Sequence, residues 1–480
     1  MREAFHARLK CIPRLLPLAG LLLLSMAADA ALPRTVTAAM RDAGVSRGAV
    51  AVYVRRVDQP KPLLTHNAGQ PMNPASTMKL LTTYAGLELL GSAYSWKTEV
   101  YADGPVIDGV LEGNLVIKGY GDPALTLAGF WDMLRVIRAS GLREIRGDLV
   151  LDRGHFQPAA HDTGAFDGEP WRAYNAAPDA LMINAKATRF IFRGDAAQGQ
   201  VAIKADPDLP QLKIVNLVEF RQVPCADWKD RISHQVTHEG EQVLVTFGGS
   251  YSLACGEKAL SLSVFDDAVY VFHLFRQLWA EQGGTLRGSL RQGEVPPTAR
   301  KLAQIDSPPL ADVVRMINKH SNNVMARQML LTVAAEKKGA PGSARNGAIA
   351  VGEWLAEKGL DFPELVIENG AGLSRMERIS AQHLGELLIA AWNSPVMPEL
   401  MSSLPITAVD GTLEKRLRNS DVAGQAHLKT GALDGVRALA GYLLDREGRR
   451  WVVVFLINHA RAAEARAAQD ALLEWLYARE

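Results

Sequence analysis

Three short polar motifs, placed far apart in a chain of 480 residues, constrain the fold more than any other feature. In chain order they are Ser76-Thr77-Met78-Lys79, Ser321-Asn322-Asn323 and Lys429-Thr430-Gly431. The first two begin 245 positions apart (321 − 76), which is far more than one small helical subdomain requires. A fold that brings the three motifs to one site must therefore carry a large insertion between the first and the second.

The first motif opens a helical pattern. A loop rich in Gly, Pro and Asn covers residues 69–75, and apolar residues then recur at 80, 81, 84, 87 and 90, as in a helix. Ser76 lies at the positive end of this helix dipole, and Lys79 lies one turn later on the same side. A lysine amine with a lowered pKa can deprotonate a serine hydroxyl, so the pattern predicts a nucleophile and its general base. The alternative is that Ser76 only caps the helix and that Lys79 is solvated.

The second motif interrupts another helical pattern. An amphipathic segment covers residues 311–320 after two prolines, and helical periodicity resumes over residues 324–331. A polar interruption between two helices can point Ser321 and Asn323 into a cleft. There Ser321 can relay a proton to a leaving amine, and Asn323 can bind Lys79 and a substrate carbonyl. An ordinary polar turn between helices is the alternative.

The third motif ends a predicted strand, residues 424–430, and further strands are predicted over residues 436–444 and 451–458. Lys429 can pair with a substrate carboxylate, and Thr430 can share that anion. A glycine at 431 lets the substrate backbone lie against the strand edge, where a side chain would obstruct it. The alternative is an exposed lysine on an edge strand.

Together the motifs form the set used by serine acyl-transferases that open amides and β-lactams. The chain resembles the class C penicillin-binding proteins, which are D-alanyl-D-alanine carboxypeptidase/endopeptidases of the penicillin-binding protein 4 type (peptidase family S13). Besides the motifs, the resemblance rests on three segments: Pro74-Ala75 before Ser76, Tyr174-Asn175-Ala176-Ala177-Pro178, and Asn369-Gly370-Ala371-Gly372-Leu373-Ser374-Arg375.

The resemblance implies an α/β (α+β) fold. Its penicillin-binding, serine β-lactamase-like transpeptidase domain has an antiparallel sheet, flanking helices and a helical subdomain, and it carries a large β-rich insertion. The implied enzyme hydrolyses D-Ala-D-Ala ends and peptide cross-links of peptidoglycan through a Ser76 acyl-enzyme, is inhibited by β-lactams, and needs no metal or organic cofactor. A serine β-lactamase and a non-catalytic cell-wall peptide-binding protein are the alternatives.

The resemblance also implies a role for each site residue. Ser76 is the nucleophile and Lys79 the proton acceptor, while Ser321 and Asn323 complete the proton network. Lys429, Thr430 and Gly431 hold the terminal carboxylate, and the backbone N–H groups of Ser76 and Ala432 form the oxyanion hole. Arg375 is expected to contact the substrate peptide and Asp152 the amino group of a diamino acid, with a structural ion pair as the alternative for both.

Short strands with glycine-rich turns dominate between about residues 96 and 269, which predicts a β-rich insertion. Since the family has two extra domains, one nested in the other, we expect four regions. They are a signal peptide at 1–30, the D,D-peptidase domain at 31–96 and 270–480, a first inserted domain at 97–187 and 247–269, and a nested domain at 188–246.

The N-terminus and the cysteines indicate export. A basic stretch precedes an apolar run, Leu15 to Met26, and Ala28-Asp29-Ala30 follows as a cleavage site, so we expect a periplasmic protein that begins at Ala31. An uncleaved signal anchor is the alternative. Cys225 and Cys255 then form an even pair, 30 positions apart, which predicts a disulfide in an oxidising compartment. Two separate buried thiols are the other option.

Charge and composition restrict the partners. Lys and Arg total 53 and Asp and Glu total 52, so no net field points to nucleic acid. We expect peptidoglycan peptides and β-lactams as ligands and at most peripheral contact with a membrane, with a homodimer as one option.

Overall fold

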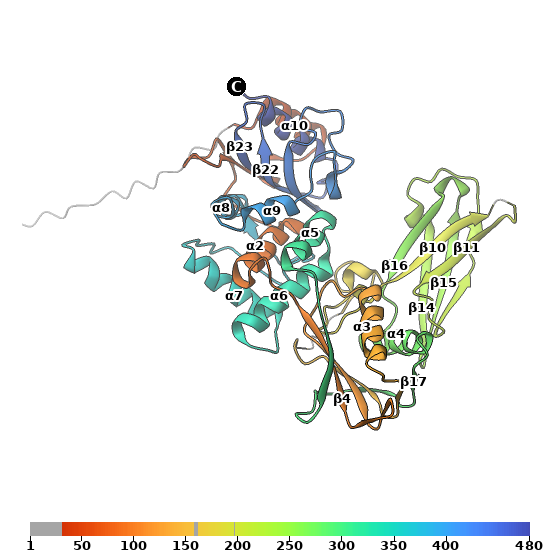
Figure 1. Ribbon diagram of the computed structural model, residues 1–480. Helices are drawn as coiled ribbons and strands as arrows, with labels where there is room; N and C mark the ends of the chain where they lie inside the picture. The colour runs from red at the N-terminus through yellow and green to blue at the C-terminus, as the bar shows by residue number, and fades with distance from the viewer. Residues whose placement is uncertain (1–30, 158–161, 196) are drawn as a thin grey trace, which may run out of the picture.

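The computed structural model describes residues 31–157, 162–195 and 197–480, so the predicted signal peptide, residues 1–30, lies outside the described residues. In the described part, no helix is long and apolar enough to cross a membrane. Figure 1 shows three regions in an elongated arrangement: a sheet near the C-terminus, a group of helices below it, and a β-rich region beyond the helices.

A five-stranded antiparallel sheet forms the first region. The predicted strands at 436–444 and 451–458 are confirmed and lie at its centre. Because β1 (Val50–Arg56) pairs with β23 (Arg450–Asn458), the N-terminal and C-terminal parts of the chain form one unit. The strand order is β2 (Leu64–His66), β1 (Val50–Arg56), β23 (Arg450–Asn458), β22 (Val436–Leu444) and β21 (Ala426–Leu433).

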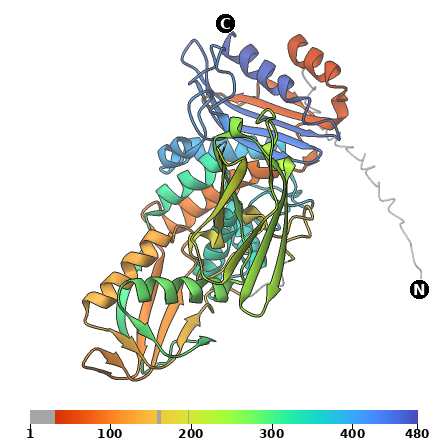
Figure 2. The ribbon, with the colours of Figure 1, turned by 90° about the vertical axis from the view of Figure 1, so that its right-hand side faces the viewer.

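Both faces of this sheet are covered by helices. Val453 and Phe455 point to the outer face, whereas Val454 and Leu456 point to the inner face and pack against the helical region. Since successive side chains of a strand point to opposite faces, a strand covered on both sides is apolar at nearly every position. The two helices of the outer face, which lie side by side in Figure 2, are α1 (Arg34–Asp42) and α10 (Arg466–Tyr477).

The helices of the middle region surround α2. Every residue of α2 from Met78 to Leu87 is buried, which explains why its apolar residues are not confined to one stripe. The elements of this region are β3 (Pro71–Met72), η2 (Ala75–Thr77), α2 (Met78–Leu90), α5 (Leu310–His320), α6 (Asn323–Lys338), α7 (Ala344–Glu357), β20 (Ile379–Ser380), α8 (Ala381–Trp392), α9 (Met397–Ser403) and η7 (Gly411–Leu413). The short turn η1 (Arg47–Ala49) leads into β1 of the sheet.

The first inserted domain contains a five-stranded sheet and two helices that share one apolar core. The sheet is β18 (Leu290–Gln292), β9 (Leu149–Asp152), β7 (Asn114–Gly119), β4 (Lys97–Asp103) and β19 (Arg300–Asp306). The helices are α3 (Leu127–Ala139) and α4 (Asp267–Glu281), and a small sheet adds β17 (Thr285–Leu286), β8 (Glu144–Ile145), β6 (Val110–Leu111) and β5 (Val106–Ile107).

The nested domain is built from two small sheets that enclose an aromatic core around Phe192 and Phe247. One sheet is β11 (Gln200–Asp206), β10 (Thr188–Asp195) and β16 (Glu257–Leu262). The other is β12 (Leu212–Asn216), β15 (Gln242–Tyr251), β13 (Glu219–Phe220) and β14 (Ile232–Glu239). The 3-10 turns of the insertions are η3 (Ala173–Asn175), η4 (Asn184–Lys186), η5 (Trp228–Arg231) and η6 (Leu253–Cys255).

The insertion continues past the boundaries that we expected from the sequence. β17, β18 and β19, within residues 285–306, pair with β8, β9 and β4, although the inserted domain was expected to end at residue 269. β15 and β16 likewise extend the nested domain past residue 246. Short strands pair with partners that are distant in sequence, and composition does not reveal such pairing. We propose 97–187 and 263–306 for the first inserted domain and 188–262 for the nested domain.

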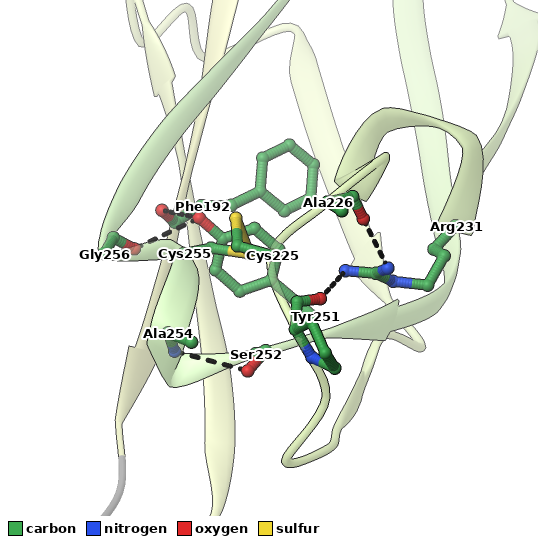
Figure 3. Close-up of a disulfide and its surroundings, with 10 residues drawn as sticks. Phe192, Cys225, Ala226, Arg231, Tyr251, Ser252, Ala254, Cys255 and Gly256 are labelled. Carbon is green, nitrogen blue, oxygen red and sulfur yellow. Dashed lines mark hydrogen bonds between the residues drawn. A yellow bond between two sulfur atoms is a disulfide. The ribbon is translucent and has the colours of Figure 1, made fainter.

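The predicted disulfide between Cys225 and Cys255 is confirmed, with Cα atoms 4.8 Å apart (Figure 3). It joins a loop before η5 to the turn η6 after β15. Next to it, Tyr251 donates its hydroxyl to the carbonyl of Gly256 at 3.1 Å, and Arg231 donates to the carbonyl of Ala226 at 2.6 Å. The disulfide therefore belongs to the nested domain and lies outside the five-stranded antiparallel sheet and the helices below it.

Replacing both cysteines by serine should lower the free energy of unfolding of the nested domain by about 2–4 kcal/mol, because the unfolded loop gains conformational freedom. Thermal unfolding followed by circular dichroism measures this loss. The rate at which an acylating reagent modifies Ser76, the predicted nucleophile, should stay unchanged. An unaltered melting curve, or slower Ser76 acylation in a folded variant, would contradict the expectation.

Candidate active site

Ser76 lies in the turn η2, directly before α2, and side chains from distant elements hold that turn. The Asn73 side chain accepts a hydrogen bond from the N–H of Ala75 at 2.9 Å. Asn458, at the end of β23, accepts from the N–H of Asn73 at 2.8 Å and donates to its carbonyl at 3.0 Å. Ala75 has a positive φ of 44°, which is unusual for a residue with a side chain. The sheet and the helix therefore fix the position of Ser76 together.

Lys79 is buried and its amine is surrounded by oxygen atoms. Its Nζ lies 3.0 Å from Oγ of Ser76 and 2.7 Å from Oδ1 of Asn323, and it also donates to the carbonyl of Ala371. The side chain has no exposed surface. The alternative of a solvated lysine is thus wrong for this position, and the predicted contacts of Lys79 with Ser76 and Asn323 are present.

The surroundings of Lys79 lower its pKa well below the ordinary value of 10.5. Burial is the largest cause, because a charged ammonium loses its hydration. The positive charge of Lys429 lowers the pKa further and Arg327 adds to this effect, whereas the negative charge of Glu377 opposes it. A neutral amine next to a serine hydroxyl can accept its proton.

Ser321 and Lys429 form a second pair beside the first. Ser321 occupies the left-handed junction between α5 and α6, with φ at 55°, and the next residue, Asn322, caps α6 by accepting from the N–H of Met325. Lys429 on β21 donates to Oγ of Ser321 at 2.9 Å and to the carbonyl of Thr430 at 2.8 Å. Burial lowers the pKa of Lys429 to about 7. This pair can therefore carry a positive charge below that pH and lose it above.

Gly431 brings β21 against the turn of the predicted nucleophile. A Cβ at 431 would lie 2.8 Å from the carbonyl oxygen of Pro74 and 3.0 Å from the backbone nitrogen of Ser76. The structure thus gives a reason for this glycine that the sequence did not reveal, because the close neighbour is the turn of Ser76. Ala432 follows on the same strand. The hydroxyl of Thr430 forms a 2.8 Å hydrogen bond with that of Thr412 from η7.

Arg375 and Asp152 lie outside this cluster of hydrogen bonds. Arg375 is exposed, donates to the carbonyl of Asp434 at 2.8 Å, and lies over the ring of Phe166 at 4.8 Å. It lines a cavity of about 750 Å³ together with Phe166. Asp152 is buried, and its carboxylate pairs with Lys118 at 2.9 Å. For Asp152 the structure therefore contains the ion pair that we had named as the alternative.

Several site residues were not predicted from the sequence. They are Asn458, the carbonyl of Ala371, and Glu377, which is fully buried behind the loop of residues 368–374. Asn73 was recognised only as part of a polar loop. None of these belongs to the three motifs, and their positions follow from contacts between distant segments. Among the described residues, no group of three or more His, Cys, Asp or Glu side chains is arranged to hold a metal ion.

Comparison with known proteins gives consistent matches over most of the chain. The model of the D-Ala-D-Ala carboxypeptidase 3 (S13) family matches residues 32–479. The D-alanyl-D-alanine carboxypeptidase of Actinomadura sp. (strain R39) is 31% identical over 454 residues, which cover 91% of this chain and 82% of the relative. The D-alanyl-D-alanine carboxypeptidase DacB of Haemophilus influenzae is 26% identical over 419 residues, which cover 85% of each chain.

A solved structure shows the same fold. The crystal structure of penicillin binding protein 4 (dacB) from Haemophilus influenzae matches with a TM-score of 0.78 and 24% identity, covering 92% of this chain and 99% of that chain. A second structure of that protein, in complex with a β-lactam, matches with a TM-score of 0.74. The predicted fold class is thereby confirmed.

Replacing Gly431 by alanine should slow acylation of Ser76 by about tenfold or more, because the new methyl group displaces the turn around Ser76 and misaligns the reacting atoms. Gly48→Ala is the matched control, since a Cβ there meets no atom within 4 Å. The measurement is the rate of Ser76 acylation by an activated ester, with circular dichroism to confirm folding. Equal rates for the two variants would show that the contact at 431 is unimportant.

Proposed function

This chain belongs to the D-Ala-D-Ala carboxypeptidase 3 (S13) family, and on that premise we propose that Ser76 is the acyl-enzyme nucleophile and Lys79 its general base. The chain is a D-alanyl-D-alanine carboxypeptidase of the penicillin-binding protein 4 type. The observation that carries the assignment of residues is the buried Lys79 amine, 3.0 Å from Oγ of Ser76.

The acylation step follows from this contact. Burial and the charge of Lys429 favour the neutral form of Lys79, so its amine can take the proton of Ser76. The serine oxygen then attacks the carbonyl of the penultimate D-Ala. The backbone N–H groups of Ser76 and Ala432 are proposed to bind the oxygen that becomes negative, and the close approach at Gly431 supports this role.

Substrate selection follows from the Lys429 and Ser321 pair. In its charged form Lys429 attracts the terminal carboxylate, and Thr430 shares that anion. Ser321 accepts a hydrogen bond from Lys429 and is proposed to pass a proton to the leaving amine of D-Ala. Asn323 holds the Lys79 amine at 2.7 Å and can bind a substrate amide. Water then hydrolyses the acyl-enzyme.

The outer parts of the site are assigned to the substrate peptide. Arg375 is proposed to contact it at the rim of the cavity that Phe166 lines. Asp152 is proposed to meet the amino group of a diamino acid, which would have to share the carboxylate with Lys118. When the leaving amine belongs to a cross-linking side chain, the same steps cut a cross-link, so we propose endopeptidase activity as well.

The setting of the enzyme is also a proposal. Residues 1–30 direct export, and the enzyme acts on peptidoglycan in the periplasm. The Haemophilus influenzae protein has been crystallised in complex with a β-lactam, which supports binding of β-lactams by this chain. A homodimer and peripheral contact with the membrane belong to the proposal too.

Incubation with benzylpenicillin should add one penicilloyl group to Ser76, because a strained β-lactam amide acylates the activated serine and deacylates slowly. Intact-mass spectrometry with peptide mapping measures this adduct. Ser76→Ala should show no adduct, whereas Ser46→Ala, at an exposed serine of the same domain, should react as the parent does. Rapid loss of penicillin without an adduct would instead indicate a serine β-lactamase, and neither loss nor adduct would indicate a binding protein.

The preference of the enzyme for substrates with a free C-terminal carboxylate should fall as the pH rises. Because the pKa of Lys429 is lowered to about 7, its amine is charged below that pH and becomes neutral above it, so its attraction for a carboxylate is lost. We expect the ratio of kcat/KM for an acyl-D-Ala-D-Ala peptide to that for its C-terminal amide to drop by about three- to tenfold from pH 6 to pH 8. A constant ratio over this range would contradict the role of Lys429.

A further inference from the structure

One buried carboxylate, that of Glu377, organises the loop of residues 368–374. Glu377 precedes β20 and has no exposed surface. Its Oε1 accepts hydrogen bonds from the backbone N–H groups of Glu368 at 3.2 Å, Asn369 at 3.0 Å and Gly370 at 2.9 Å. Three converging donors favour an ionised carboxylate. The loop is therefore wrapped around the Glu377 carboxylate.

The same loop touches both members of the Ser76–Lys79 pair. The carbonyl of Ala371 accepts a hydrogen bond from the Lys79 amine. The carbonyl of Ser374 accepts from the side chain of Asn73 at 2.8 Å, and Asn73 in turn holds the turn before Ser76. The backbone of Gly372 packs so closely that a Cβ would lie 2.0 Å from the carbonyl oxygen of Ala75. Displacement of this loop would therefore move the nucleophile and the base together.

The charge of Glu377 also acts on Lys79 through space. Three charged groups act electrostatically on the Lys79 amine: Lys429 on β21, Arg327 on α6, and Glu377, which precedes β20. The two cations favour the neutral amine, whereas Glu377 favours the protonated amine. The negative charges of Glu377 and Glu368 also favour the charged form of the Arg327 guanidinium. Burial raises the pKa of Glu377, and its backbone donors and Lys79 oppose that effect.

We propose that Glu377 is a positioning residue for the reaction: its buried carboxylate holds the loop of residues 368–374 against Ser76 and Lys79 and, when ionised, keeps the Lys79 amine from losing its proton too readily. This inference rests on the proposed function of Ser76 and Lys79. Glu377, which lies outside the three motifs, thus helps to keep Lys79 neutral enough to accept the proton of Ser76 and basic enough to hold that proton.

Glu377→Gln tests the charge, because the amide keeps an oxygen for the three N–H groups and has nearly the same shape. The rate of Ser76 acylation is measured from pH 4.5 to 9 with a thioester that carries no carboxylate, so that recognition by Lys429 does not enter. We expect the acid limb of the profile to move to lower pH by about one unit, since Lys79 loses the group that favours its protonation. The plateau should fall as well, because a weaker base transfers protons less effectively.

Two further variants provide a second test of the Glu377 carboxylate and a control. Glu377→Asp withdraws the carboxylate from the loop, so we expect a smaller displacement of the acid limb in the same direction together with a lower plateau. It replaces Glu377→Gln if that protein does not fold. Glu99→Gln removes another buried carboxylate, on β4 in the first inserted domain, and should leave the profile unchanged.

The position of the acid limb decides the result. If the acid limb of the pH–rate profile is displaced in the Glu377 variants, the proposal is supported. If the limb stays at the parental pH, the proposal is overturned, even if the plateau rate falls. A purely structural role lowers the rate without changing the pH at which Lys79 titrates. Failure of the parent protein to become acylated at Ser76 would instead count against the proposed function. The two failures are therefore distinguishable.

Discussion

The architecture of the site depends on one constraint: a lysine amine is held out of water, within hydrogen-bond distance of a serine hydroxyl. Lys79 has no exposed surface, and its amine contacts Ser76, Asn323 and the carbonyl of Ala371. Removing a charged ammonium from water costs free energy, and this cost favours the neutral form of the Lys79 amine. The oxygen atoms around it keep the amine in place without supplying a full negative charge at contact distance.

The fold provides this environment by bringing together parts of the chain that are distant in sequence. The helix α2 is buried on all sides from Met78 to Leu87. The sheet pairs β1 with β23, so that Asn458 at a strand end can hold the turn before Ser76. The junction between α5 and α6 and the strand β21 then supply Ser321 and Lys429. The insertions leave the chain after α2 and return before α5 (Figure 1). The first inserted domain contacts α6, where Arg327 donates to the carbonyl of Asn175 and Gln328 to that of Asp179.

Much of this arrangement could be predicted from the sequence because its determinants are local. The three motifs named Ser76, Lys79, Ser321, Asn323 and Lys429, and the contacts between these side chains are present in the structure. The strands 436–444 and 451–458 and the helices at 311–320 and 324–331 were also predicted, because their apolar patterns are continuous. The role of Glu377, the contact of Gly431 with the turn of Ser76, and the strands of residues 285–306 were not predicted. Each depends on pairing between distant segments, for which one sequence carries no signal.

The most direct test of this account is the titration of Lys79 itself. Lysine labelled with ¹³C at the ε carbon can be followed by NMR across the pH range, with Lys79→Arg and Lys429→Arg used to assign the two buried side chains. The account predicts that the Lys79 signal titrates well below the ordinary 10.5 in the folded protein and returns to that value on unfolding. A Lys79 signal that titrates near 10.5 in the folded protein would contradict it, because the lysine would then be charged at neutral pH and unable to accept the proton of Ser76.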